Sequence, residues 1–171
     1  MELVSSARLA EWNDVWSLSV VFGLAAVPWT YAFLGPLDVP LWPAFVGSAT
    51  VFAAGGGRAG LTRGAASNVA GICYAAATLA VVDGLFGGAL LALSLVVGAF
   101  MFLASLHEAV PTLSFTPGGF FGYATLFSVH AAGATVLGVP GLAGETLAAT
   151  VSMVAGALIG FAADLASDEL A

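Results

Sequence analysis

The sequence predicts an all-α fold: a polytopic membrane protein whose six transmembrane helices form two inverted three-helix repeats. Of its 171 residues, 60% are hydrophobic and 8% are charged, whereas a soluble protein of this size needs more polar residues to cover its surface. In addition, residues 47–52 (GSATVF) return as residues 122–127 (GYATLF), at an offset of 75 residues. When each copy of a duplicated unit has an odd number of spans, the copies are inverted and meet near the bilayer midplane.

The offset of 75 also pairs Pro36 with Pro111. A third segment, 69–71 (VAG), matches 154–156 at an offset of 85, as a longer loop between the fifth and sixth spans would produce. Sequences rich in alanine, glycine and valine match themselves by chance, so this short match is weaker evidence than the longer one. The predicted organisation is a polar cytoplasmic lead-in (1–13), a first three-helix repeat (14–83), a second three-helix repeat (84–166) and an acidic tail (167–171).

The first repeat begins with an apolar run over residues 14–34, about the 20 residues that a helix needs to cross the hydrocarbon core. Pro36 and Pro40 then break the helix in a tight external turn. The second run, 41–54, has only 14 residues before the triplet Gly55-Gly56-Gly57. It is short for a full span and is typical of a half-helix with irregular backbone at its exit.

The remaining predicted spans cover residues 64–82, 86–106 and 117–137, and a last helix opens at Glu145 and continues into the acidic tail. Asp83-Gly84 is predicted as the external turn between the third and fourth spans. Pro117 suits a first helical position, because its missing donor is not needed there. The carboxylate of Glu145 complements the positive end of a helix.

The cationic residues are Arg8, Arg58 and Arg63, and the chain has no lysine. With a cytoplasmic N-terminus, two crossings return the chain to the cytoplasm at Arg58, so all three arginines lie inside, as the positive-inside rule requires. Six spans then place both termini in the cytoplasm and predict a multi-pass protein of the cell (cytoplasmic) membrane. The net charge of −7 argues against a nucleic-acid partner, since phosphate binding needs a cationic surface.

Residues 113–122 (LSFTPGGFFG), followed by 124–127 (ATLF), resemble the Phe-x-Pro-Gly-x-Phe-x-Gly signature of the YcdZ-like, or DUF1097-like, family of small inner-membrane proteins of unknown function. Residues 56–61 (GGRAGL) resemble the second loop of the same family. The similarity covers most of the six-span region and leaves out the polar lead-in. It implies a small polytopic membrane protein, and it implies no substrate.

The repeated hexapeptide supplies the first candidate pore residues. Thr50 and Thr125 place hydroxyls inside helices at equivalent positions, where they could bond a solute from both sides. The alternative is a hydroxyl that bonds back to its own helix or to a neighbouring one. Gly47 and Gly122 remove side chains where helices might cross, which would hold the two motifs together; packing alone would also explain them.

The other candidates are aromatic or polar. Phe52 and Phe127 could close a narrow pore as stacked rings, or be ordinary core or lipid-facing residues. His130 is the one histidine inside a predicted apolar span; such a residue is a candidate for donating to a solute or relaying a proton, and a bond to another helix is the alternative. Asn68, early in the third span, could satisfy freed backbone groups near the glycine triplet or bind a solute.

These residues predict a channel or facilitator for a small uncharged polar solute or gas, of the class of urea, ammonia, water and carbon dioxide. An ion conductor needs charged rings or a carbonyl filter, and the spans offer mainly hydroxyls, aromatic rings and glycine backbone. The alternatives are a proton-coupled transporter that uses His130, or a non-transporting membrane scaffold. We expect a homo-oligomer in the lipid bilayer, with no enzymatic activity, catalytic residue, metal site or cofactor.

Overall fold

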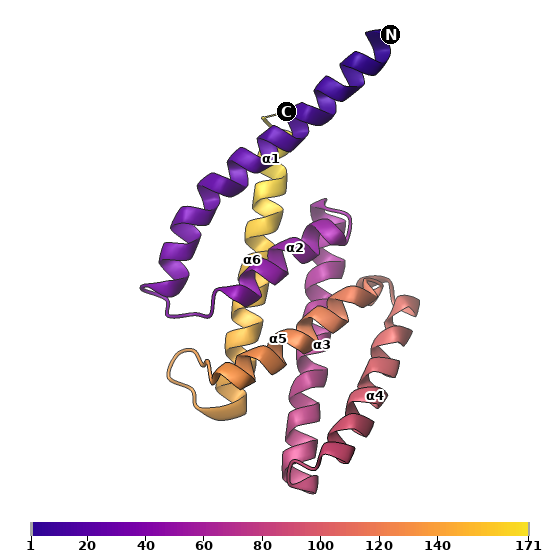
Figure 1. Cartoon of the computed structure of the whole chain (residues 1–171), viewed down its shortest axis with the longest axis vertical. Helices are drawn as coiled ribbons and strands as arrows, with labels where there is room; N and C mark the ends of the chain where they lie inside the picture. Colours follow the sequence, from indigo (N-terminus) through magenta and orange to yellow (C-terminus); the bar gives the residue numbers. More distant parts are fainter. Residues whose placement is uncertain (1, 171) are drawn as a thin grey trace.

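The computed structural model describes the backbone of residues 2–170 and the side chains of residues 12–170, and every regular element within this part of the chain is helical. The helices are α1 (Glu2–Leu34), α2 (Trp42–Ala53), α3 (Gly57–Phe86), α4 (Leu90–Leu106), α5 (Thr116–Ala132) and α6 (Gly141–Asp168), with short 3-10 turns η1 (His107–Ala109) and η2 (Pro111–Leu113) between α4 and α5 (Figure 1). The predicted lead-in is continuous with α1. Its side chains up to Glu11, with Arg8 among them, lie outside the described residues.

Four segments are long and apolar enough to cross a membrane: Trp12–Leu34 of α1, all of α3, Leu90–Ala109 from α4 onward, and all of α6. The other two helices are shorter, with 12 residues in α2 and 17 in α5. A straight crossing takes about 20 residues. Both short helices run obliquely to α3 and α6 (Figure 1). The structure therefore confirms an all-helical membrane protein in which the second apolar run is a short helix, as its length predicted.

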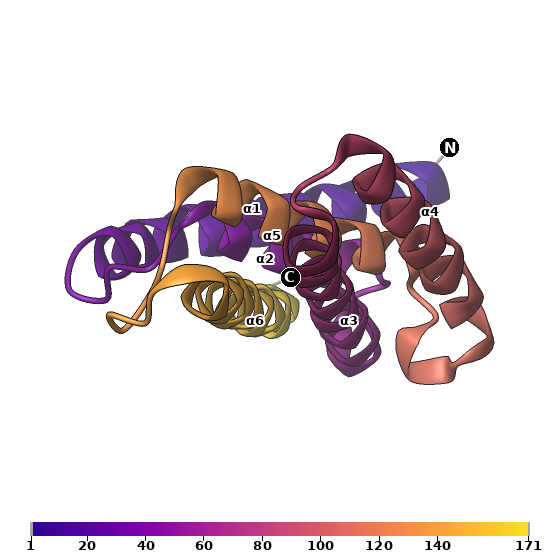
Figure 2. The same cartoon turned by 90° about the horizontal axis from the view of Figure 1, so that it is seen from below.

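The centre of the bundle is the pair α3 and α6, which pack against each other and run in opposite directions (Figure 1). Helix α2 packs across α6, and α5 packs across α3. Figure 2 shows α2 and α5 on the same face of the central pair. The outer helices are α1, which contacts α6, and α4, which contacts α3.

Small residues make the central packing possible. On α3 the buried face carries Gly60, Gly64, Ser67, Gly71 and Ala75, spaced three or four residues apart along one side of the helix. Such small faces let membrane helices approach closely, since van der Waals contact and hydrogen bonds, rather than the hydrophobic effect, hold helices together in lipid.

The outer helices present large apolar side chains to their surroundings. In α4 only Ala104 is buried, and Leu90, Leu91 and Phe102 are exposed. Exposed patches of this extent are unfavourable in water. They are consistent with direct contact between these helices and the lipid bilayer.

The predicted turn at Asp83-Gly84 is wrong, because both residues lie inside α3, which continues to Phe86. The helix ends at two successive glycines, Gly87 and Gly88, with φ of 56° and 76°. The N–H of Gly88 donates to the carbonyl of Val82 at 3.1 Å. A left-handed glycine that satisfies the last free carbonyls is a stronger helix stop than one internal glycine.

The ends of α5 and α6 also differ from prediction. Helix α5 stops at Ala132 rather than near Leu137, because Gly133 adopts the left-handed conformation with φ of 61°. Helix α6 begins at Gly141, so Glu145 lies one turn inside it rather than at its opening. The irregular backbone expected after the second apolar run is confirmed, since φ is positive at Gly55, Gly56 and Gly57.

Candidate functional site at the crossing of α3 and α5

Two pairs of helices cross at glycines. Where α2 meets α6, a side chain on Gly47 would overlap the carbonyl of Met153, and one on Gly156 would overlap the carbonyl of Ala44. Each helix thus contributes one glycine on which the backbone of its partner lies. Gly47 thus lies at a close helix crossing, but its partner is α6 and not the second copy of the motif in α5, so the expectation that the two glycines hold the motifs together is wrong.

The crossing of α5 and α3 has the same construction. A side chain on Gly122 would overlap the carbonyl of Asn68, and one on Gly71 would overlap the carbonyl of Gly119. Gly122 therefore also lies at a crossing, as its position predicted. The hydroxyl of Thr78 and the phenol of Tyr123 form a buried hydrogen bond of 2.7 Å between the same two helices.

Polar atoms without partners lie on α3 at the second crossing and at the start of α5. Asn68 is 1% exposed, and neither its Nδ2 nor its Oδ1 has a hydrogen-bond partner; the same holds for the buried hydroxyls of Ser67 and Thr116. Within the described side chains these are four of five such atoms, the fifth being Nε1 of Trp29. Burying an amide or hydroxyl without a partner costs free energy, so a group of such atoms requires an explanation.

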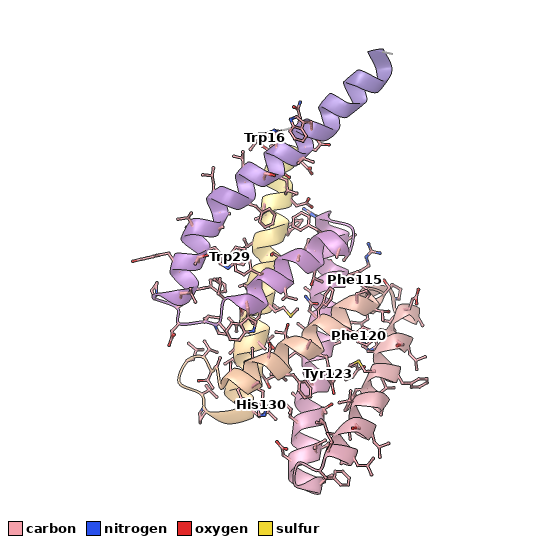
Figure 3. The ribbon with its side chains drawn as sticks, in the orientation of Figure 1. Trp16, Trp29, Phe115, Phe120, Tyr123 and His130 are labelled. Carbon is pink, nitrogen blue, oxygen red and sulfur yellow. The ribbon has the colours of Figure 1, made fainter. Side chains whose placement is uncertain are left out.

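The start of α5 faces these side chains. A Cβ atom on Gly118 would lie 3.2 Å from Oδ1 of Asn68 and 2.8 Å from Cβ of Ser67. No side chain caps α5, which begins at Thr116. In this first turn Pro117 has no N–H, and the N–H of Gly118 donates to the carbonyl of Phe115 at 2.9 Å. In Figure 3, Phe115 marks this beginning of α5, and Tyr123 lies between α5 and α3 further along.

The two threonines of the repeated motif are buried, at 0% exposure for Thr50 and 4% for Thr125. Thr50 donates from Oγ1 to the carbonyl of Val46 at 2.7 Å, which is the local bond that the sequence left open as the alternative. Both residues lie in the protein interior.

The two phenylalanines of the motif make separate aromatic contacts. Phe52 packs against Phe22 of α1, with ring centroids 5.4 Å apart. Phe127 stacks on Tyr123 of its own helix at 5.1 Å. The pair of opposed rings that the sequence suggested is replaced by these two contacts.

His130 lies in the last turn of α5 rather than in the middle of a span, and Figure 3 places it at the opposite end of α5 from Phe115. Its Nδ1 is 2.7 Å from Oε2 of Glu145, and the two side chains are 40% and 10% exposed. Sequence reasoning had treated the two residues separately. The loop between α5 and α6 turns the chain back and brings them together.

The glycine triplet is occupied by groups of the chain itself. The N–H of Gly57 donates to Oδ2 of Asp164 at 2.6 Å, and Nη2 of Arg63 donates to the carbonyl of Ala54 at 2.8 Å. Asn68 is not at this turn, because it lies further along α3, at the crossing with α5. Asp164 of α6 therefore caps the start of α3, and Arg63 of α3 bonds the carbonyl that follows the end of α2.

Other polar contacts were not predicted from the sequence. His107 is buried, and its Nε2 lies 2.6 Å from the hydroxyl of Tyr74. Ser67, Thr78 and Tyr123 were not singled out. The available signal was the spacing on α3, where Ser67 and Thr78 fall on one helix face with Gly71 and Ala75 between them.

Two cavities lie away from the crossings. One, of about 330 Å³, lies near the α1–α2 and α5–α6 loops and is lined by residues including Asp38, Trp42 and Thr135. The other, of about 360 Å³, lies between α1 and the end of α6, at Trp16 and Leu170. Neither is lined by a residue predicted from the repeat.

The helices and their apolar exterior define the protein as an all-helical integral membrane protein. The model of a family described as "Protein of unknown function (DUF1097)" matches residues 19–168, and the chain belongs to this family. The resemblance inferred from residues 113–127 is thereby confirmed. No curated protein and no solved structure matches the chain.

Proposed function

We propose that this protein is a channel or facilitator for a small uncharged polar solute or gas, built from two inverted three-helix repeats. The observation that carries the proposal is the equivalence of the two glycine crossings. With α1–α3 as one repeat and α4–α6 as the other, each short helix packs on the third helix of the opposite repeat. Inverted repeats of this kind form solute routes where they meet, near the bilayer midplane.

The burial of the short helices supports the repeat. The six buried residues of α2 are Pro43, Ala44, Gly47, Ser48, Thr50 and Val51. Adding 75 to each number gives Gly118, Gly119, Gly122, Tyr123, Thr125 and Leu126, and all six are buried in α5. The two short helices therefore bury six matching positions at the offset of the repeated motif, which supports the repeat.

The central helices α3 and α6 also support the repeat, at the offset of 85 residues that the match of residues 69–71 with 154–156 suggested. Nine of the ten buried residues of α3 have a buried counterpart in α6, and the exception is Leu79, whose counterpart is the half-buried Asp164. The crossings correspond too. The contact of Gly47 with Met153 becomes that of Gly122 with Asn68 when the repeats are exchanged.

The chemistry of the interior favours an uncharged solute. The polar groups at the α3–α5 crossing are hydroxyls and one carboxamide, whereas selective ion pathways use charged rings or arrays of carbonyls. The lipid bilayer is the first partner. A homo-oligomer is part of the proposal, because the face of α3 and α6 away from α2 and α5 is uncovered in Figure 2 and Val151 and Leu158 of α6 are exposed.

The proposed orientation places both termini in the cytoplasm. The beginning of α1 and the end of α6 lie at the same end of the molecule (Figure 1). The bond between Gly57 and Asp164 holds the start of α3, with Arg58 and Arg63, near the end of α6. This grouping is consistent with the positive-inside rule.

Proteoliposomes test the function. The purified protein is reconstituted, and stopped-flow light scattering follows volume changes with urea, ammonia, water and carbon dioxide. We expect at least one of these to cross faster than in protein-free liposomes. Rates equal to those of empty liposomes for all of them would support a membrane scaffold instead.

A second candidate is a proton-coupled transporter, which the contact between His130 and Glu145 favours. Histidine exchanges protons near neutral pH, and an acid–base pair inside a membrane protein is a common element of proton relays. His130→Ala should then flatten the dependence of the transport rate on pH. A pH profile equal to that of the wild-type protein would remove this mechanism and leave the facilitator.

A further inference from the structure

We propose that the α3–α5 crossing is a binding site for an amide-type solute, a small neutral molecule such as urea that both donates and accepts hydrogen bonds. The inference deepens the proposed function and rests on it for the role of the site in transport. The groups proposed to bind the solute are the carboxamide of Asn68, the hydroxyl of Ser67 and, at the start of α5, the hydroxyl of Thr116.

The first argument is the unfilled bonding capacity. A carboxamide offers two donors and two acceptor positions, and each hydroxyl offers one donor and two acceptor positions. None of these side-chain atoms has a partner in this structure. Asn68 and Ser67 are nine-tenths buried or more, so bulk water does not satisfy them.

The second argument is the direction of the groups. Oδ1 of Asn68 points to the first turn of α5, since it lies 3.2 Å from where a Cβ atom of Gly118 would be. The first turn of α5 packs closely on this part of α3, because a Cβ atom on Gly118 would lie 2.8 Å from Cβ of Ser67 and 2.9 Å from Cδ1 of Phe115. A ligand at this contact would meet the donors and acceptors of the α3 side chains and the hydroxyl of Thr116 from α5.

The third argument comes from the equivalent crossing, which needs no such polar groups. In the α2–α6 crossing, the position of Asn68 is taken by Met153, and that of Thr116 by Leu41. The position of Ser67 is taken by Ser152, whose Oγ donates to the carbonyl of Pro40. A glycine crossing therefore packs with apolar or satisfied residues, and packing does not account for the polar set at α3–α5.

The charges select a neutral ligand. The protein side chains proposed to bind the solute carry no formal charge. The nearest arginine along α3, Arg63, directs its guanidinium to the carbonyl of Ala54. Carbon dioxide only accepts hydrogen bonds, so it would leave acceptors such as Oδ1 of Asn68 unmatched. A urea or primary amide edge presents a carbonyl beside an N–H group, which is complementary to the carboxamide of asparagine. A buried site built in this way rejects analogues that lack the matching group.

Nuclear magnetic resonance of the full chain in lipid nanodiscs tests binding directly. Asn13 and Asn68 are the two asparagines of the chain, so 15N-asparagine labelling yields two side-chain amide signals. Asn13→Gln assigns them, since Asn13 is exposed on α1. With urea as the probe, we expect the Asn68 signal to shift and saturate while the Asn13 signal does not. Tetramethylurea, which has no donor, should leave Asn68 unchanged.

Urea flux through variants of Asn68 tests the role of the site in transport. Asn68→Met, which installs the residue of the other crossing, should lower protein-mediated urea flux by about tenfold, as the loss of one or two hydrogen bonds predicts. Asn68→Ala, which adds no volume, should do the same and guards against misfolding of the larger variant. Asn13→Gln is the control and should retain wild-type flux.

The outcomes separate the two proposals. A saturable Asn68 shift without urea flux would keep the site and overturn the facilitator function. Urea flux with no Asn68 shift, and with Asn68→Ala at the wild-type rate, would overturn the site and keep the function. A shift that is identical for urea and tetramethylurea would overturn the amide-specific assignment.

Discussion

The two glycine crossings of this protein share one backbone arrangement and differ in chemistry. At α2–α6, Met153 is apolar and Ser152 bonds to the carbonyl of Pro40. At α3–α5, Asn68 and Ser67 occupy the equivalent positions without partners. Because the backbones approach equally closely at both, the polar residues are not needed for close approach. The glycines therefore hold the helices together at both crossings, whereas the unpartnered polar groups at α3–α5 are available to a ligand.

Glycine substitutions should have the largest effect, and the same effect at both crossings. Gly47→Val and Gly122→Val each place side-chain atoms on the partner backbone, and we expect each to lower stability by about 3 kcal/mol or more. Thermal unfolding in detergent measures this. Gly98→Val on α4 is the control, because nothing lies within 4 Å of its Cβ position. A tolerated Gly122→Val would contradict the close crossing of α3 and α5.

Substitution of Asn68 should not lower stability, in contrast to the glycine substitutions. Replacing an unpartnered buried amide with an apolar side chain removes its desolvation cost, so Asn68→Ala should unfold as late as the wild-type protein or be more stable by about 1 kcal/mol. The comparison is Met153→Ala, which removes a buried side chain that is 1% exposed and should cost about 2 to 4 kcal/mol. Equal losses for both variants would mean that Asn68 serves packing.

Substitutions of Ser152 and Ser67 should show the smallest difference in stability. Ser152→Ala removes the bond to the carbonyl of Pro40 and should cost about 1 kcal/mol. Ser67→Ala removes a hydroxyl without a partner and should be neutral or slightly stabilising. Both variants delete one oxygen from a fully buried serine at an equivalent position, so their difference in unfolding temperature isolates the hydrogen bond. A larger loss for Ser67→Ala would reverse the distinction between the crossings.

Much of the fold could be predicted from local patterns. The apolar runs predicted the helices, the 14-residue run before Gly55 predicted a short helix, and the triplet predicted irregular backbone, because each depends on residues close together in the chain. The turn at Asp83-Gly84 was wrong because one internal glycine is a weaker helix stop than the pair Gly87-Gly88, which can close the last carbonyls in the left-handed conformation.

The site was less predictable than the fold. Asn68 and His130 were identified as unusual polar residues in apolar segments, and Gly47 and Gly122 as contact points. The partner of His130 was missed, since Glu145 reaches it only after α5 ends early at Gly133. The absence of a partner for Asn68 was also invisible, because it depends on which part of α5 lies over α3.

Composition and order along the chain alone established a membrane-embedded helical protein and its short second helix, because hydropathy, helix length and glycine conformation are local properties of the sequence. The tertiary structure alone decided which buried polar atoms have partners. Hydrogen-bond satisfaction between helices depends on residues far apart in the chain, here Ser67 and Asn68 with the start of α5 and Ser152 with Pro40, and no local pattern fixes those contacts.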